Sequence, residues 1–172
     1  MRLLLAIIGF VGIIVALALA GYTLGGFYSV AASEPDWDPV AWVLIRVRDA
    51  SINRHSDGLR SPVALDDPEV VKAGARAFAT RGCATCHGAP GVNWAKFSEA
   101  LNPDPPDLKE AGAKDAPGRI FWVVKNGIKM TAMPSFGAIG AEDREIWSIA
   151  AFIKKLPSIS EADYKAWTAS GG

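Results

Sequence analysis

The chain has 172 residues, with 18 Lys and Arg against 18 Asp and Glu, so its formal net charge is zero. This length accommodates one compact domain and a short appendage. The balanced charge excludes a nucleic-acid-binding protein that relies on a strongly basic surface. The sequence holds only two cysteines, which excludes a disulfide-rich scaffold and a four-cysteine zinc site.

The N-terminal segment 1–30 is almost free of charge. No charged residue lies between Arg2 and Glu34, and 3–20 is apolar throughout. A helix of this length spans a hydrocarbon core of about 30 Å. The pattern therefore predicts a single transmembrane anchor over 1–30, with a cleaved signal peptide as the alternative. Because Arg2 precedes the span and acidic residues follow it, the remainder of the chain is expected outside the cytoplasm.

A connector is predicted over 31–65. Within it, 39–52 favours a short helix with Asp38 as N-cap, and 53–62 is polar and is interpreted as a linker. The tryptophans and arginines of this helix suit a membrane headgroup boundary, but the same segment also suits an ordinary helix that covers the domain. Both interpretations stay open.

The segment 66–157 predicts a compact domain, and 158–172 a C-terminal tail with a short helix. Proline, aspartate and glycine residues mark the expected helix ends. The expected helices of the domain run from 68 to about 82, from 117 to 127 and from 141 to 156. No alternating run is long enough for a sheet, so the fold class is all-α.

The two cysteines lie in the motif Cys83-Ala84-Thr85-Cys86-His87, the pattern for covalent attachment of a c-type haem. Cys83 and Cys86 are one helical turn apart, so both thiols can reach the vinyl groups on one edge of a porphyrin. His87 then becomes the proximal iron ligand. A zinc site is disfavoured because the only other histidine is His55, in the predicted linker. One haem c, bound through Cys83 and Cys86, is the expected cofactor.

The second axial ligand of the iron is predicted to be Met133. It lies in the sequence Thr-Ala-Met-Pro-Ser-Phe between two predicted helices, and the following proline stiffens the loop. Met130 is the main alternative, and His55 is a more remote one. With His87, Met133 completes the predicted metal ligands.

With these motifs the sequence resembles a class I c-type cytochrome, of the monohaem, membrane-anchored bacterial kind, over about 66–156. The resemblance implies a cytochrome c fold wrapped around the haem. It also implies that the first and last helices of the domain cross at Gly74, with Phe78 and Phe152 beside the crossing. A proline carbonyl, of Pro105 or Pro106, is expected to bond the proximal histidine, and Arg119 and Trp122 are candidate partners of the haem propionates.

The resemblance implies a function in electron transfer. Iron held by His and Met has no open position, so we expect a carrier of single electrons, not an enzyme, with no small-molecule substrate. The expected partners are redox proteins: a respiratory complex, a terminal oxidase or a periplasmic dehydrogenase. The expected location is the bacterial inner membrane, with the haem domain in the periplasm, or the soluble periplasm after signal cleavage. A fixed haem c subunit of an oxidase or dehydrogenase complex is the alternative, followed by a haem peroxidase or gas sensor with a labile Met133.

Overall fold

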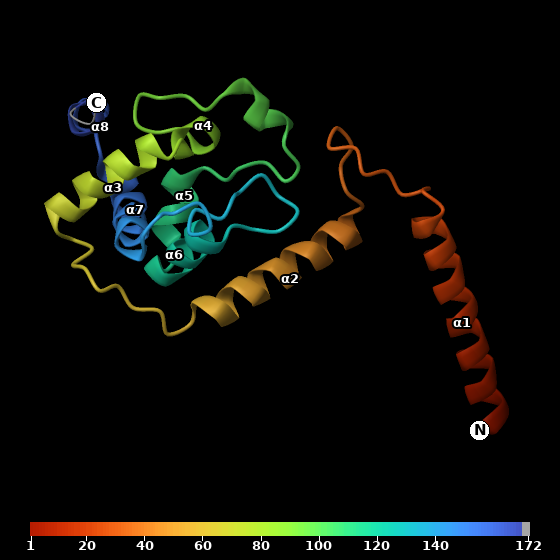
Figure 1. Cartoon of the computed structure of the whole chain (residues 1–172). Coiled ribbons are helices and arrows are strands. Elements are labelled where there is room, and N and C mark those ends of the chain that lie inside the picture. Colours follow the sequence, from red (N-terminus) through yellow and green to blue (C-terminus); the bar gives the residue numbers. More distant parts are fainter. Residues whose placement is uncertain (170–172) are drawn as a thin grey trace. The chain divides into compact units, whose positions relative to one another are not determined.

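The computed structural model describes residues 1–169 and divides the chain into two compact units, Met1–Pro35 and Asp36–Gly172. Residues 170–172 of the predicted tail lie outside the described residues. The described secondary structure is helical (Figure 1), apart from an isolated bridge between Ala89 and Val92. The predicted all-α class is confirmed.

The first unit contains one long helix, α1 (Arg2–Leu24). Its mean hydropathy is 3.0, none of its span is buried within the structure, and it is long and apolar enough to cross a membrane. The helix ends before the predicted limit of 30, because Gly25 and Gly26 follow and Gly26 has a φ of 77°. A left-handed residue of this kind cannot continue an α-helix.

The second unit opens with α2 (Asp38–Ser56), which is longer than the predicted helix over 39–52. The prediction of Asp38 as N-cap is wrong: Asp38 is the first helical residue, and Trp37 caps the helix without a side-chain hydrogen bond. The predicted linker is likewise helical up to Ser56. The extension has a physical cause, because Ile52 is buried against the domain and this contact stabilises the last turns.

Two helices form the centre of the domain, α3 (Pro68–Thr80) and α7 (Asp143–Lys155). They cross where Gly74 lies against the backbone of Ser148: a Cβ placed on Gly74 would lie 1.9 Å from the Ser148 carbonyl oxygen. Beside the crossing, the rings of Phe78 and Phe152 are 5.2 Å apart, and both side chains are fully buried. The crossing implied by the resemblance is thus present.

Further helices surround this pair. Their bounds are α5 (Leu108–Lys114), α6 (Pro117–Asn126) and α8 (Glu161–Thr168). Helices α5 and α6 pack on α7, α8 packs on α3, and α2 packs on α6. Stacking of Phe121 on Trp147, at 4.2 Å between ring centroids, joins α6 to α7, while Tyr164 of α8 stacks on Phe152.

Between the attachment motif and the helix predicted from 117, the chain contains two elements that the sequence pattern did not indicate, α5 and the short 3-10 helix η1 (Lys96–Ala100). Neither has an apolar repeat long enough to be recognised. Asp107 caps α5 by accepting a hydrogen bond from the Lys109 amide at 2.7 Å. This part of the chain is therefore partly helical.

Candidate functional site

The cysteine motif forms a separate one-turn helix, α4 (Cys83–His87), between two glycines. Gly82 has a φ of 75° and Gly88 a φ of 67°, a region that residues with a Cβ rarely adopt. A Cβ on Gly88 would also lie 3.2 Å from the Val92 carbonyl oxygen. The two glycines thus isolate α4 from α3 and turn the chain sharply after His87.

Both thiols of α4 are free and half-buried. Burial raises the pKa of the Cys83 thiol to about 12. A thiol protonated at neutral pH is a poor nucleophile, which disfavours a thioredoxin-like dithiol. Cys83 also packs against the hydrophobic core, together with Ala84 and Ala89. This apolar surrounding suits a large apolar group attached to the thiols.

His87 is held by a backbone carbonyl. Its Nδ1 lies 3.0 Å from the Pro106 oxygen. A carbonyl can only accept, so Nδ1 carries the proton of the neutral ring and Nε2 keeps its lone pair. Burial lowers the pKa of His87, while the bond to Pro106 opposes this shift. Of the two candidate prolines, the structure places the carbonyl of Pro106 at the histidine. A neutral ring with a free Nε2 is the form that binds metal.

Met133 lies in a loop that folds back on the end of α6. Its carbonyl accepts a hydrogen bond from the Ile128 amide at 3.2 Å, and its own amide is 3.1 Å from the Thr131 hydroxyl. The Met133 side chain is half-buried and packs against the same core as Cys83. Met130, by contrast, is 96% exposed. The structure therefore keeps the Met133 thioether near the core and leaves Met130 in solvent.

A cavity of about 440 Å³ adjoins His87. Its lining is mixed: Ala89, Val92 and Trp94 are apolar, whereas Lys96, Glu99, Asp107 and Lys109 are charged, and neither the cysteines nor Met133 line it. Trp94 also donates a hydrogen bond to Glu99 at 3.3 Å. Val92 and Trp94 carry no signal in the sequence, because an apolar residue in a loop belongs to no periodic pattern. Two free thiols, an imidazole with an open nitrogen and a thioether at the core form a donor set that fits a covalently bound haem.

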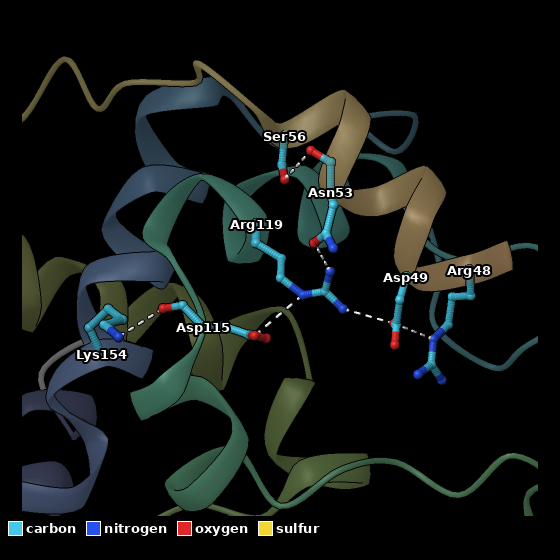
Figure 2. Close-up of polar contacts among 7 residues, drawn as sticks. All are labelled: Arg48, Asp49, Asn53, Ser56, Asp115, Arg119 and Lys154. Atoms are coloured by element: carbon cyan, nitrogen blue, oxygen red, sulfur yellow. Dashed lines mark hydrogen bonds and ion pairs between the residues drawn. The ribbon is translucent and has the colours of Figure 1, made fainter. Parts of the chain in front are cut away.

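Arg119 and Trp122 have other partners in the structure. The Arg119 guanidinium lies 2.6 Å from the Asn53 amide oxygen, 3.0 Å from Asp49 and 3.3 Å from Asp115, as Figure 2 shows. The Trp122 ring stacks on His55, with ring centroids 5.6 Å apart. Both residues thus join α6 to α2.

His55 itself lies in the last turn of α2 and not in a linker. Its Nδ1 is 2.7 Å from the Ser51 carbonyl oxygen, and its ring covers Trp122. These contacts give His55 a packing role. The sequence pattern could not show this role, because residues far apart in the chain make the contacts.

Residues 69–153 match the model of a protein family described as cytochrome c oxidase, cbb3-type, subunit III. No curated protein matches the chain in sequence. The match covers the crossing helices, the Cys83–His87 motif and Met133. The matched segment is a c-type cytochrome domain, a class of haem proteins that carries electrons. With a single C-x-x-C-H motif in 172 residues, the chain is a monohaem c-type cytochrome.

Proposed function

We propose that the protein transfers single electrons through one haem c, bound covalently to Cys83 and Cys86 and ligated by His87 and Met133. The observation that carries this proposal is the geometry of α4. Both thiols are free, and the adjacent imidazole is held through Nδ1 by the Pro106 carbonyl, so that Nε2 is available for iron. When bound, the haem supplies reversible one-electron exchange between its ferric and ferrous states.

The chain's own residues set the conditions for this exchange. The Pro106 carbonyl fixes the His87 ring and increases its basicity. The loop around Met133 is held in place by Thr131 and by Ser135, whose hydroxyl donates to the Lys125 carbonyl at 2.7 Å. A thioether ligand favours the ferrous state and raises the reduction potential. These residues give an electron carrier with no position for a substrate.

The proposed location is a bacterial inner membrane, with α1 as an uncleaved anchor and the cytochrome domain in the periplasm. The length and hydropathy of α1 support this proposal. Tethering keeps the carrier close to membrane-bound redox partners and raises its effective concentration there. The proposed partners are a respiratory complex, a terminal oxidase or a periplasmic dehydrogenase.

A second candidate function is that of a fixed haem c subunit in an oxidase complex. The description of the matched family, cytochrome c oxidase, cbb3-type, subunit III, favours it. Purification from membranes in mild detergent distinguishes the two functions. A free carrier elutes alone, whereas a subunit elutes with oxidase polypeptides in fixed ratio.

The covalent attachment can be tested on the full chain, produced in a host that exports it and attaches haem c. We expect the intact mass to equal the uncleaved chain plus one haem. Replacing both cysteines, C83S and C86S, should remove the haem mass while the chain stays in the membrane fraction. A wild-type mass without haem would refute the attachment site. A mass that lacks an N-terminal segment would show cleavage and would refute the uncleaved anchor.

A further inference from the structure

The first half of α2 carries apolar side chains that the cytochrome domain leaves exposed. Trp42 is 60% exposed, Leu44 56% and Val47 62%. Trp37, just before the helix, is 71% exposed. An apolar surface of this kind on one helical element marks an interaction site.

The helix has two different faces. Asp49, Ile52, Asn53 and Ser56 follow the spacing of one helical face, and this face contacts the domain. Val40, Val43, Leu44 and Val47 follow the same i, i+3, i+4, i+7 spacing on another face. The second stripe therefore points away from the surface on which α2 packs.

The second half of α2 is fixed to the domain. Ile52 is 3% exposed, and Arg119 of α6 contacts both Asp49 and Asn53 (Figure 2). A Cβ on Gly118 would lie 3.3 Å from the Ser56 carbonyl oxygen, so α6 and the end of α2 approach closely. Because one helix carries both halves, whatever binds the first half also orients the domain.

The composition of the first half suits a lipid surface. Tryptophans concentrate at the boundary between headgroups and hydrocarbon, and arginines interact with anionic headgroups. At about 100° per residue, Trp37 and Arg48 lie beside the apolar stripe, and Arg48 also donates to Asp49 at 3.1 Å. Trp42 and Arg46 lie on the opposite side of α2. The Arg46 guanidinium lies 5.5 Å from the centre of the Trp42 ring, a cation–π pair. An exposed apolar stripe with a tryptophan and an arginine beside it is typical of helices that lie in the membrane interface.

The chain also limits how far α2 can be from a membrane. Segment 25–37 joins the apolar helix α1 to α2. Fully extended, it reaches about 45 Å at most. Once α1 spans the bilayer, α2 meets the surface at a high effective concentration, so that even weak insertion is favoured.

We propose that the stripe formed by Val40, Val43, Leu44 and Val47, with Trp37 beside it, inserts into the interface of the membrane that α1 spans. This insertion holds the cytochrome domain at a set orientation to the bilayer. The inference rests on the proposed membrane anchor. It assigns α2 a role that neither haem attachment nor the family match supplies.

The test uses the full, haem-loaded chain in vesicles of phosphatidylethanolamine and phosphatidylglycerol. An environment-sensitive fluorophore is attached to a thiol introduced by V43C or L44C, both at exposed positions outside the core. K165C, on the exposed surface of α8, is the control position. The chain without an introduced cysteine is the control for background labelling of Cys83 and Cys86. Quenching is measured with iodide in water and with nitroxide groups on the lipid chains.

We expect loss of iodide quenching and strong lipid quenching at 43 and 44, and the reverse at 165. Adding V47D to the V43C protein should restore iodide quenching while the chain still sediments with vesicles. Iodide access at 43 in the V43C protein without V47D overturns the inference while leaving the anchor intact. Shielding from both quenchers, with cross-linking between copies, also overturns it, because the stripe would then bind a second chain. A chain that does not sediment refutes the anchor itself.

Discussion

At the scale of residues, the two methionines near the site differ sharply in environment. Met133 is half-buried against the core, whereas Met130 is 96% exposed and adopts a φ of 60°. The difference follows from the loop, whose hydrogen bonds to Ile128 and Thr131 turn the Met133 side chain toward the protein. The exposed methionine has no comparable restraint and serves as a matched control.

Replacing Met133 by Ala should lower the reduction potential and open the iron to external ligands, because the thioether that favours the ferrous state is lost. M130A should leave both properties unchanged. Potentiometric titration and absorption spectra of the two purified variants provide the measurement. A shift caused by M130A and not by M133A would assign the ligand to Met130.

Glu145 is a second residue with a defined role. Its carboxylate accepts two hydrogen bonds from Arg81, each 2.8 Å, which join the end of α3 to α7. The hydrogen bonds from Arg81 lower the pKa of Glu145 below its ordinary value. A carboxyl with a lowered pKa in the folded state stabilises the protein at neutral pH, and this stabilisation is lost as the pH falls through the folded pKa.

We therefore expect E145Q to lower the Tm at neutral pH and to reduce the further loss of Tm on acidification. Thermal unfolding followed by circular dichroism across pH 3 to 7 measures this difference. E110Q, at an exposed carboxylate of α5, is the control and should follow the wild-type curve. If the Tm of E145Q and the Tm of the wild type fall by the same amount on acidification, the Arg81–Glu145 ion pair does not contribute to stability.

At the scale of elements, the crossing of α3 and α7 depends on Gly74. A methyl group there would overlap the Ser148 carbonyl, which belongs to the backbone and cannot rotate away. We expect G74A to destabilise the domain by about 2 kcal/mol or more, the cost of overpacking a well-packed contact. A73S, on the exposed side of α3, should change stability by less than about 0.5 kcal/mol. Denaturant unfolding of both variants gives the values.

Arg119 connects α6 to α2 and is also the predicted propionate partner. If its main role is the contact with Asp49, Asn53 and Asp115, R119A should raise amide hydrogen exchange in the second half of α2. The reduction potential should then stay the same. R54A, at an exposed position of α2, should change neither quantity. A shift in potential without faster exchange would instead support contact with a propionate.

The sequence predicted those parts of the fold whose signals are local. The five residues of the attachment motif act within one or two turns of chain, as do the aspartate and glycine residues at helix ends: Asp67 caps α3 and Gly127 follows α6. The crossing at Gly74 followed from the resemblance to a family with that crossing. These features position the site largely by themselves.

The remaining features depend on contacts between distant residues. Pro105 and Pro106 are neighbours, and only the path of the loop over 88–107 decides which carbonyl reaches His87. The Arg119 contacts join positions 66 and 70 residues apart, so no local pattern indicates that α2 continues to Ser56. The sequence pattern did not indicate α5, because this helix is short and has no apolar repeat.

At the scale of the whole molecule, a small c-type cytochrome domain follows a long apolar helix in the same chain. The zero net charge gives no long-range electrostatic steering toward a partner. The proposed membrane tether would supply the alternative, because it would confine carrier and partner to one surface. The proposed insertion of the α2 stripe would also orient the domain on that surface.

The proposed haem is ligated by both His87 and Met133, so that it carries electrons without binding a substrate. This proposal is tested most directly by mixing carbon monoxide with the reduced, membrane-bound full chain. We predict no rapid change in the absorption spectrum of the wild type, and a rapid change in M133A, whose iron has lost a ligand. A rapid change in the wild type would show an open or labile position and would contradict the electron-carrier assignment.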